Sequence, residues 1–158
     1  MPHHLNNGTH NFVSIMTIED YLESSYWVID PLPRQVPAQS RGQYFRIEEH
    51  YRSRPLIDAL YRRFTDILLK LNCYTDLAFS TDGEQWETNP LPTQIEAMVR
   101  QSLSDLRMLY VMLPAVETLI TLSADDTYMT IYNLSVETLE LLASLVASEG
   151  LFLWKPEQ

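Results

Sequence analysis

Residues 107–132 read RMLYVMLPAVETLITLSADDTYMTIY, and this stretch decides the fold class. Its first apolar run, 107–113, ends at a proline and predicts a buried strand. The segment 118–122 mixes threonine with leucine and isoleucine in alternation, and a second β-prone segment follows at 128–132. The polar Ala-Asp-Asp at 124–126 lies between these two segments, which therefore predict an antiparallel hairpin.

Three segments around this hairpin have helical periodicity. Residues 55–72 place apolar side chains at helical spacing and alternate charges on the opposite face. A second helix is predicted at 92–104, where a proline suits the first turn, and a third at 135–149, where a serine suits the N-cap. Gly150 occupies the position where a left-handed residue often ends a helix, and a final β-prone segment follows at 151–155.

The N-terminal third gives weaker signals. Thr17 is a predicted N-cap for a short helix that ends near residue 24, because acids occupy its first turn. Bulky β-prone side chains follow at 26–29, and prolines then predict an irregular loop as far as residue 42. Residues 43–51 fit a short helix or an extended segment equally well.

Two further strands are predicted at 74–80 and 84–87. They flank Asp82-Gly83, a dipeptide typical of tight hairpin turns. The pattern as a whole predicts a single α+β domain over 16–158, with a mostly antiparallel sheet, about three main helices on one face and a short N-terminal helix. Residues 1–15 are rich in His and Asn and are predicted to form a flexible extension. Met16 is therefore a candidate start codon.

Composition places the chain among globular proteins. It has 158 residues, of which 46% are hydrophobic and 20% charged, and no stretch approaches the length of a membrane span. The single cysteine, Cys73, excludes an internal disulfide, which fits a reducing compartment and predicts a cytoplasmic location. Because Cys73 ends an apolar helical run, we predict a buried structural thiol rather than a nucleophile.

Charge is distributed unevenly along the chain. The net formal charge is −4 over residues 1–33, +4 over 34–70 and −10 over 71–158, which gives −10 in total. Such an asymmetry bears on which partners approach a protein rather than on its fold. The acidic final segment favours a basic partner, although simple solubility explains the same charge.

Motifs for catalysis are absent from the sequence. It contains no phosphate-binding loop, no nucleophile elbow and no His-Glu-x-x-His helix, and four glycines argue against a glycine-rich nucleotide loop. The acids near Asp82-Gly83 lack the spacing of a calcium loop. We therefore predict no enzyme activity, no cofactor and no metal. The opposing hypothesis is a hydrolase in which distant carboxylates converge on His50.

The segment 34–63 supplies a second alternative, nucleic-acid binding. It contains seven arginines interleaved with the aromatic residues Tyr44, Phe45 and Tyr51, which could hold phosphates and stack bases. The overall charge of −10 opposes this hypothesis, because it repels a polyanion at long range. Nucleic acid is thus the less favoured partner.

The favoured prediction is a non-catalytic protein-binding domain. Small, acidic α+β proteins without catalytic motifs include many bacterial immunity and antitoxin proteins, which neutralise a basic toxin or effector; this is an analogy of class alone. Self-association is the second possibility for the partner. The predicted binding residues are acids of the last segment and two tryptophans that would serve as anchors if exposed: Glu84, Trp86, Glu87, Asp125, Asp126 and Trp154.

Overall fold

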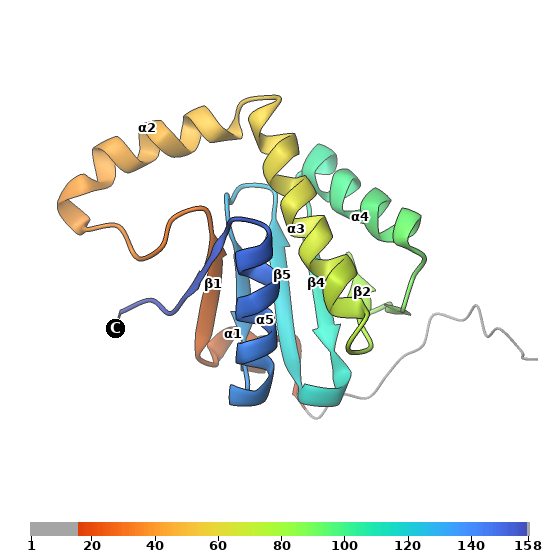
Figure 1. Cartoon of the computed structure of the whole chain (residues 1–158). Helices are drawn as coiled ribbons and strands as arrows, with labels where there is room; N and C mark the ends of the chain where they lie inside the picture. Colours follow the sequence, from red (N-terminus) through yellow and green to blue (C-terminus); the bar gives the residue numbers. More distant parts are fainter. Residues whose placement is uncertain (1–15, 158) are drawn as a thin grey trace, which may run out of the picture.

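The computed structural model describes residues 16–157, so the extension predicted for 1–15 lies outside the described residues. Its centre is a seven-stranded antiparallel sheet in the order β3-β2-β4-β5-β6-β1-β7 (Figure 1). The strands are β1 (Tyr26–Asp30), β2 (Ala78–Ser80), β3 (Glu87–Thr88), β4 (Met108–Leu113), β5 (Thr118–Ser123), β6 (Met129–Tyr132) and β7 (Phe152–Trp154). The helices are α1 (Ile18–Glu23), α2 (Arg41–Arg52), α3 (Leu56–Asn72), α4 (Pro92–Asp105) and α5 (Val136–Ser148), with short 3-10 turns η1 (Ala38–Ser40) and η2 (Pro114–Val116).

The predicted α+β class is confirmed, and its centre is the predicted hairpin. In β4 and β5, Val111 lies opposite Ile120, and Ile120 in turn lies opposite Ile131 of β6. These three side chains belong to one core, whereas Met112 and Leu119 belong to a second core on the other side. The alternation of side chains in 107–132 therefore divides the two faces of the sheet, as a period of two requires.

The first face of the sheet is covered by α3, α4 and α5. All three contribute to the main core, with Phe64 and Leu68 of α3 fully buried among side chains of the strands. Ser135 accepts a hydrogen bond from the Thr138 backbone N–H at the start of α5, and Gly150 has a φ of 71° just after the helix ends. The three main helices and their position on one face are as predicted.

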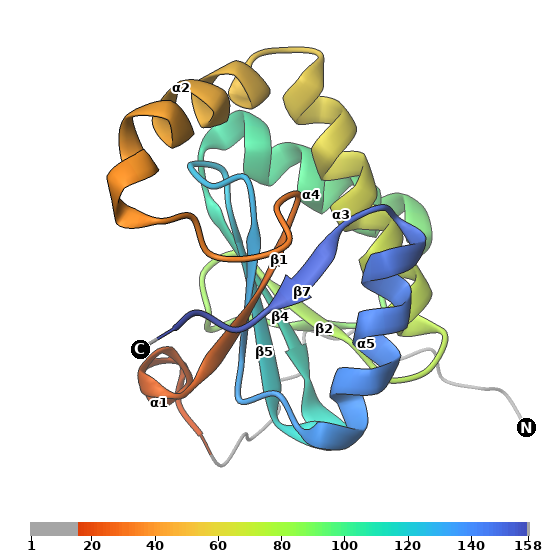
Figure 2. The ribbon, with the colours of Figure 1, turned by 60° about the vertical axis from the view of Figure 1, so that its left-hand side comes forward.

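The second face is covered only in part. Helix α1 packs there, on the side opposite α5 (Figure 2), and buries Tyr21 completely against Trp86, Met112 and Leu119. Its predicted N-cap is confirmed: Thr17 Oγ1 accepts from the Asp20 N–H at 3.1 Å, and Asp20 accepts from the Thr17 N–H at 3.0 Å. Helix α2 lies over the β1 end of the same face (Figure 2).

The N-terminal half of the chain differs from the prediction in two ways. Residues 26–30 were not expected in the sheet, yet β1 lies within it and pairs with both β6 and β7. The segment 43–51, which fits two conformations by sequence, is helical within α2. The terminal strand was predicted to lie beside an earlier one, and it does so as an edge strand against β1.

The predicted hairpin at 74–87 is confirmed, but with much shorter strands. Only residues 78 and 79 pair with 87–88, because residues 81–86 form a loop organised by side chains. Ser80 Oγ accepts from the Gly83 N–H, and Asp82 Oδ1 accepts from the N–H groups of Glu84 and Gln85. These hydrogen bonds replace the ladder that a two-residue turn would have continued.

The prediction of a buried thiol is wrong. Cys73 is exposed, because it lies one position beyond the last residue of α3, where the apolar stripe has already ended. Its Sγ lies 3.7 Å from the carbonyl oxygen of Leu69.

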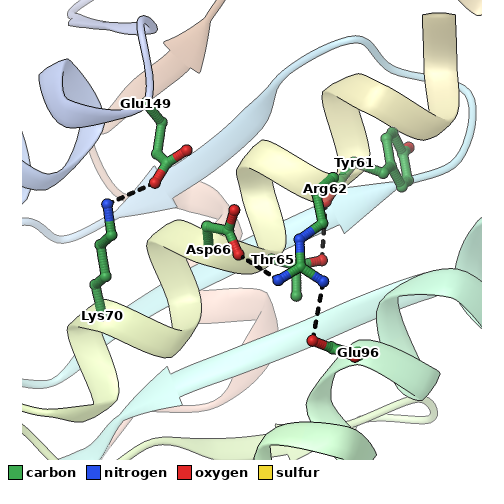
Figure 3. Close-up of polar contacts among 7 residues, drawn as sticks. All are labelled: Tyr61, Arg62, Thr65, Asp66, Lys70, Glu96 and Glu149. Carbon is green, nitrogen blue, oxygen red and sulfur yellow. Dashed lines mark hydrogen bonds and ion pairs between the residues drawn. The ribbon is translucent and has the colours of Figure 1, made fainter.

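Ion pairs join α3 to both neighbouring helices on the first face (Figure 3). Arg62 contacts Asp66 on its own helix at 2.8 Å and Glu96 of α4 at 2.9 Å. Lys70 contacts Glu149, just after α5, at 2.6 Å. The alternating charges of α3 predicted pairs within the helix, but Lys70 instead pairs with a carboxylate on another element.

Candidate functional site

The six predicted binding residues lie in three separate parts of the sheet. Glu84, Trp86 and Glu87 lie at the β2–β3 end of the sheet, whereas Trp154 lies on β7 at the opposite edge. Six strand-to-strand steps separate β3 from β7, a span of about 29 Å at about 4.8 Å per step. The predicted residues therefore do not form one contiguous face.

The remaining two acids form the turn between β5 and β6. Asp125 is exposed, while Asp126 is half-buried beside Tyr128 and its N–H donates to the Ser123 carbonyl oxygen at 3.0 Å. Burial, and then the charge of Glu48 on α2, raise the pKa of Asp126. These acids thus lie near α2 rather than near Glu84.

Trp86 was predicted to anchor a partner if its side chain is exposed, and the side chain is instead buried. Its side chain is only 6% exposed and forms part of the second core with Tyr21 and Met112. The ring therefore supports the floor of a pocket and cannot insert into a partner. Trp154 is half-buried, and its indole ring lines a different pocket.

An open pocket of about 490 Å³ lies between α1 and the 81–86 loop, and we call it the α1 pocket. Its apolar lining includes Ile18, Trp86 and Met112. The charged residues in its lining are all acids: Glu19, Asp82 and Glu84. The sequence predicted only Glu84 and Trp86 of this set, because Glu19 is far away in the chain and is brought there by α1.

The 81–86 loop fixes the acidic side of the α1 pocket. Asp82 accepts hydrogen bonds from the N–H groups of Gln85 and Glu84 and from the Ser80 hydroxyl, and these bonds lower its pKa. Gly83, with a φ of 79°, approaches Ile18 of α1 so closely that an added Cβ would lie 2.6 Å from Ile18 Cδ1. The loop and α1 are therefore held against each other.

A second pocket, of about 390 Å³, lies beneath α2, and we call it the α2 pocket. The residues that line it come from β1 and the loop after it, from α2, from the residue before β6, and from β7 and the segment after it. Five of them are aromatic. These aromatic residues are Tyr26, Tyr44, Phe45, Tyr128 and Trp154. Asp30, the last residue of β1, lies among them.

Asp30 is the most perturbed carboxylate of the site. It is 6% exposed, and burial raises its pKa to about 6. Its Oδ1 accepts one hydrogen bond, from the Leu32 N–H at 3.1 Å. The indole N–H of Trp154 lies near enough to lower the pKa, yet it makes no hydrogen bond of normal geometry within residues 16–157.

The sequence did not predict Asp30 as a functional residue. It stands before a proline, and the Asp-Pro pair was interpreted only as the end of a β-prone run. The available signal was an acid at an alternating position of that run, since residues 26, 28 and 30 share a face of β1. Its significance depends on α2, which covers that face only in three dimensions.

Helix α2 itself has no buried residue. Only Tyr44 and Glu48 are half-buried, and the Tyr44 hydroxyl donates to Glu48 Oε2 at 2.8 Å. The apolar side chains Phe45, Ile47 and Tyr51 are each about half exposed or more. Packing stabilises a 12-residue helix of this kind only weakly. Helix α2, which covers the α2 pocket, is therefore less firmly packed than α3, α4 and α5, each of which has buried residues.

The basic segment 34–63 is partly neutralised in the structure. Arg52 and Arg54 contact acids four residues away on the chain, at 3.4 and 3.9 Å, and Arg62 contacts two acids. Four arginines make no ion pair with any described residue: Arg34, Arg41, Arg46 and Arg63. Two of these lie on α2 beside Phe45.

His50 is exposed on α2, and its ring packs edge-on against the ring of Tyr51 at 5.4 Å. It is absent from the lining of both pockets described above. Across residues 16–157, no three His, Cys, Asp or Glu side chains form a group that could hold a metal ion. None of the helices in this range has the length and apolar composition needed to cross a bilayer.

Comparison with known proteins gives no further assignment. No family model matches the chain, and neither a curated protein nor a solved structure is significantly similar to it. The residues of the two pockets must therefore carry any functional argument.

Proposed function

We propose that this chain is a non-catalytic protein-binding domain that recognises a basic partner through the α1 pocket. The observation that carries the proposal is the lining of this pocket, in which apolar side chains lie beside three acids and no base. Such a surface complements a segment of a partner that carries Lys or Arg around an apolar anchor.

The acids of the α1 pocket suit this role because their charges are held in place. The hydrogen bonds to Asp82 favour its ionised form, so that its charge persists at mildly acidic pH. Glu19 lies in the first turn of α1, and Glu84 is exposed on the loop. The net charge of −10 adds long-range attraction for a basic protein and speeds its approach.

The proposed class is an immunity or antitoxin-type protein of a bacterial cytoplasm, whose partner is a basic toxin or effector. A lone cysteine, and hence no internal disulfide, is consistent with a reducing compartment. The pocket alone is smaller than a stable protein interface, which buries roughly 1,200–2,000 Å². The partner must therefore also contact the surface around α1 and the 81–86 loop.

The first experiment identifies the partner. A photo-reactive amino acid is placed at Gln85, on the exposed loop beside the pocket, and at Val136, which is 84% exposed at the start of α5. After irradiation in the native host, we expect an adduct with a basic protein from position 85 and none from position 136. An adduct with a second copy of this chain would instead favour self-association.

The second experiment separates the pocket from bulk charge. Binding of the purified partner is compared between a pocket variant, Glu19→Lys with Glu84→Lys, and a control variant on α4 and α5, Asp105→Lys with Glu140→Lys. Both variants change the net charge by the same amount, and all four acids are exposed. We expect the pocket variant to weaken binding by about tenfold or more and the control far less. Equal losses would contradict the assigned site.

Nucleic-acid binding remains the second candidate, and one observation favours it. Arg41 and Arg46 make no ion pair within residues 16–157, and both lie on the same helix as the exposed ring of Phe45, a combination suited to phosphate contact and base stacking. Fluorescence anisotropy with a labelled single-stranded oligonucleotide tests this candidate. Salt-sensitive binding that is lost on Phe45→Ala with Arg46→Ala would support it, and no binding at low salt would exclude it.

A further inference from the structure

The α2 pocket contains a buried carboxylate without a cation to neutralise it. Asp30 makes no ion pair with any Lys, Arg or His of residues 16–157, and a single backbone N–H donates to its Oδ1. Burial of an ionised carboxylate is unfavourable unless the group is paired or fully hydrogen-bonded. The indole N–H of Trp154 also lies close to the carboxylate, but it makes no hydrogen bond of normal geometry within residues 16–157.

Five aromatic residues line the same pocket as this carboxylate. Tyr44 and Phe45 of α2 line one side of the pocket, and Tyr26, Tyr128 and Trp154 line the side formed by the sheet. Rings of this kind attract a cation over their faces, most strongly where water is excluded. An acid combined with several rings is an arrangement that recognises an ammonium or guanidinium group.

We propose that the α2 pocket binds an organic cation, an ammonium or guanidinium group, between the Asp30 carboxylate and the surrounding aromatic rings. The cation would supply the opposite charge that Asp30 lacks among residues 16–157. The volume of about 390 Å³ admits a small amine or the end of a Lys or Arg side chain. This proposal does not depend on the α1 pocket.

Other charged groups near the pocket shape its selectivity. Glu48 of α2 acts on Asp30 through its negative charge and adds attraction for a cation. Arg41, which also lines the pocket, opposes a simple cation but would accept an anionic group on the same ligand. The Tyr44 hydroxyl is occupied by Glu48, and the Tyr128 hydroxyl interacts with Asp126.

The proposal predicts a pH dependence with a definite sign. Only the ionised form of Asp30 attracts a cation, and burial raises the pKa of this group to about 6. Binding should therefore be strong above this pH and should weaken as the pH falls through it. Bound cation would lower this pKa in turn, which shifts the loss of binding to a lower pH at high ligand concentration.

The test uses the Trp154 indole N–H resonance, which is assigned by its loss in Trp154→Phe. The residues 16–157 include two other indoles, Trp27 and Trp86; Trp86 lines the α1 pocket and serves as an internal control. The protein is titrated with choline and with the neutral isostere 3,3-dimethylbutan-1-ol. Choline is expected to shift the Trp154 resonance, to leave that of Trp86 unchanged, and to bind more tightly than the alcohol.

Two variants make the result specific. Asp30→Asn, which keeps the shape of the side chain, should weaken choline binding by about tenfold or more, whereas Asp125→Asn, an exposed acid outside the pocket, should change it little. Equal binding of choline and the alcohol, or unchanged binding by Asp30→Asn, would overturn the proposal. So would the absence of any shift at Trp154.

A further arm of the experiment distinguishes the source of the cation. A peptide with one central lysine, an acetylated N-terminus and an amidated C-terminus is compared with choline and with the same peptide carrying Nε-acetyl-lysine. If the lysine peptide binds more tightly than choline and the acetylated peptide does not bind, the cation belongs to a protein partner. If choline binds more tightly, it belongs to a small molecule. Failure of the α1-pocket experiments would leave either result unaffected.

Discussion

Replacing Asp30 by Asn should stabilise the protein, and the gain should appear as the pH rises above the pKa of Asp30 in the unfolded chain. Asn has nearly the shape of a protonated Asp and can still accept the hydrogen bond from the Leu32 N–H. In the folded protein, burial raises the pKa of Asp30 from 3.8 to about 6. Because ionisation is easier in the unfolded chain, the carboxylate lowers the free energy of unfolding as the pH rises between these values.

The size of the effect follows from the two pKa values. A rise from 3.8 to about 6 corresponds to about 3 kcal/mol, at about 1.36 kcal/mol per pH unit. The resulting loss of unfolding free energy is small below the pKa of Asp30 in the unfolded chain and about 1 kcal/mol at pH 4.5. It reaches its full size of about 3 kcal/mol by pH 7.5. At neutral pH, Asp30→Asn should therefore raise the melting temperature by about 6–12 °C for a chain of this length.

The assay is urea unfolding of the wild type and Asp30→Asn at pH 4.5 and 7.5, followed by tryptophan fluorescence. Asp125→Asn is the control, because this exposed acid on the β5–β6 turn should change stability by less than about 0.5 kcal/mol at both pH values. A destabilised Asp30→Asn at pH 7.5 would refute the reasoning, since it would mean that a cation already neutralises Asp30. An equal gain at both pH values would show that the ionisation of Asp30 is not the cause.

Two further predictions concern the loop near α1 and the exposed thiol. Gly83→Ala should lower the free energy of unfolding by about 1–2 kcal/mol, because an L-residue with a φ of 79° is strained. Ile18→Ala in the same chain should not restore the loss; restoration would show that the contact with the Ile18 methyl group is the cause instead. Cys73 should react with a maleimide in the native protein as fast as a small exposed thiol, as measured by mass spectrometry. Labelling that requires urea would contradict its exposure.

Much of the fold was predictable because local signals agree with tertiary packing. Thr17 and Ser135 form the side-chain caps that their positions suggested, and the alternation in 107–132 divides the two cores correctly. Each of these features depends on residues only a few positions apart. Sequence periodicity reports such interactions directly.

The errors arose where partners lie far apart in the sequence. The strand β1 was not placed in the sheet because its neighbours, β6 and β7, come more than a hundred residues later. Lys70 was expected to pair on its own helix, but the packing of α3 on α5 brings Glu149 within reach. Cys73 lies one residue beyond a boundary that periodicity does not define sharply.

The candidate sites were harder to predict than the fold for the same reason. Glu84 was identified from its charge, but its pocket also needs Glu19 of α1. Trp86 was considered as a surface anchor because its burial depends on Tyr21, on the other side of the pocket. Asp30 gave only a weak signal, since its aromatic surroundings come from four separate parts of the chain.

The pairing of β1 with β7 has a consequence for how the protein is made. Val28 lies opposite Trp154, so the first and the last strands of the described chain are neighbours at one edge of the sheet. During synthesis on the ribosome, β1 emerges more than a hundred residues before its outer neighbour β7. Contacts between such distant segments slow folding, because a large loop must close before they form. The α2 pocket, which is lined by residues of both strands, consequently forms only after the long segment between them has been synthesised.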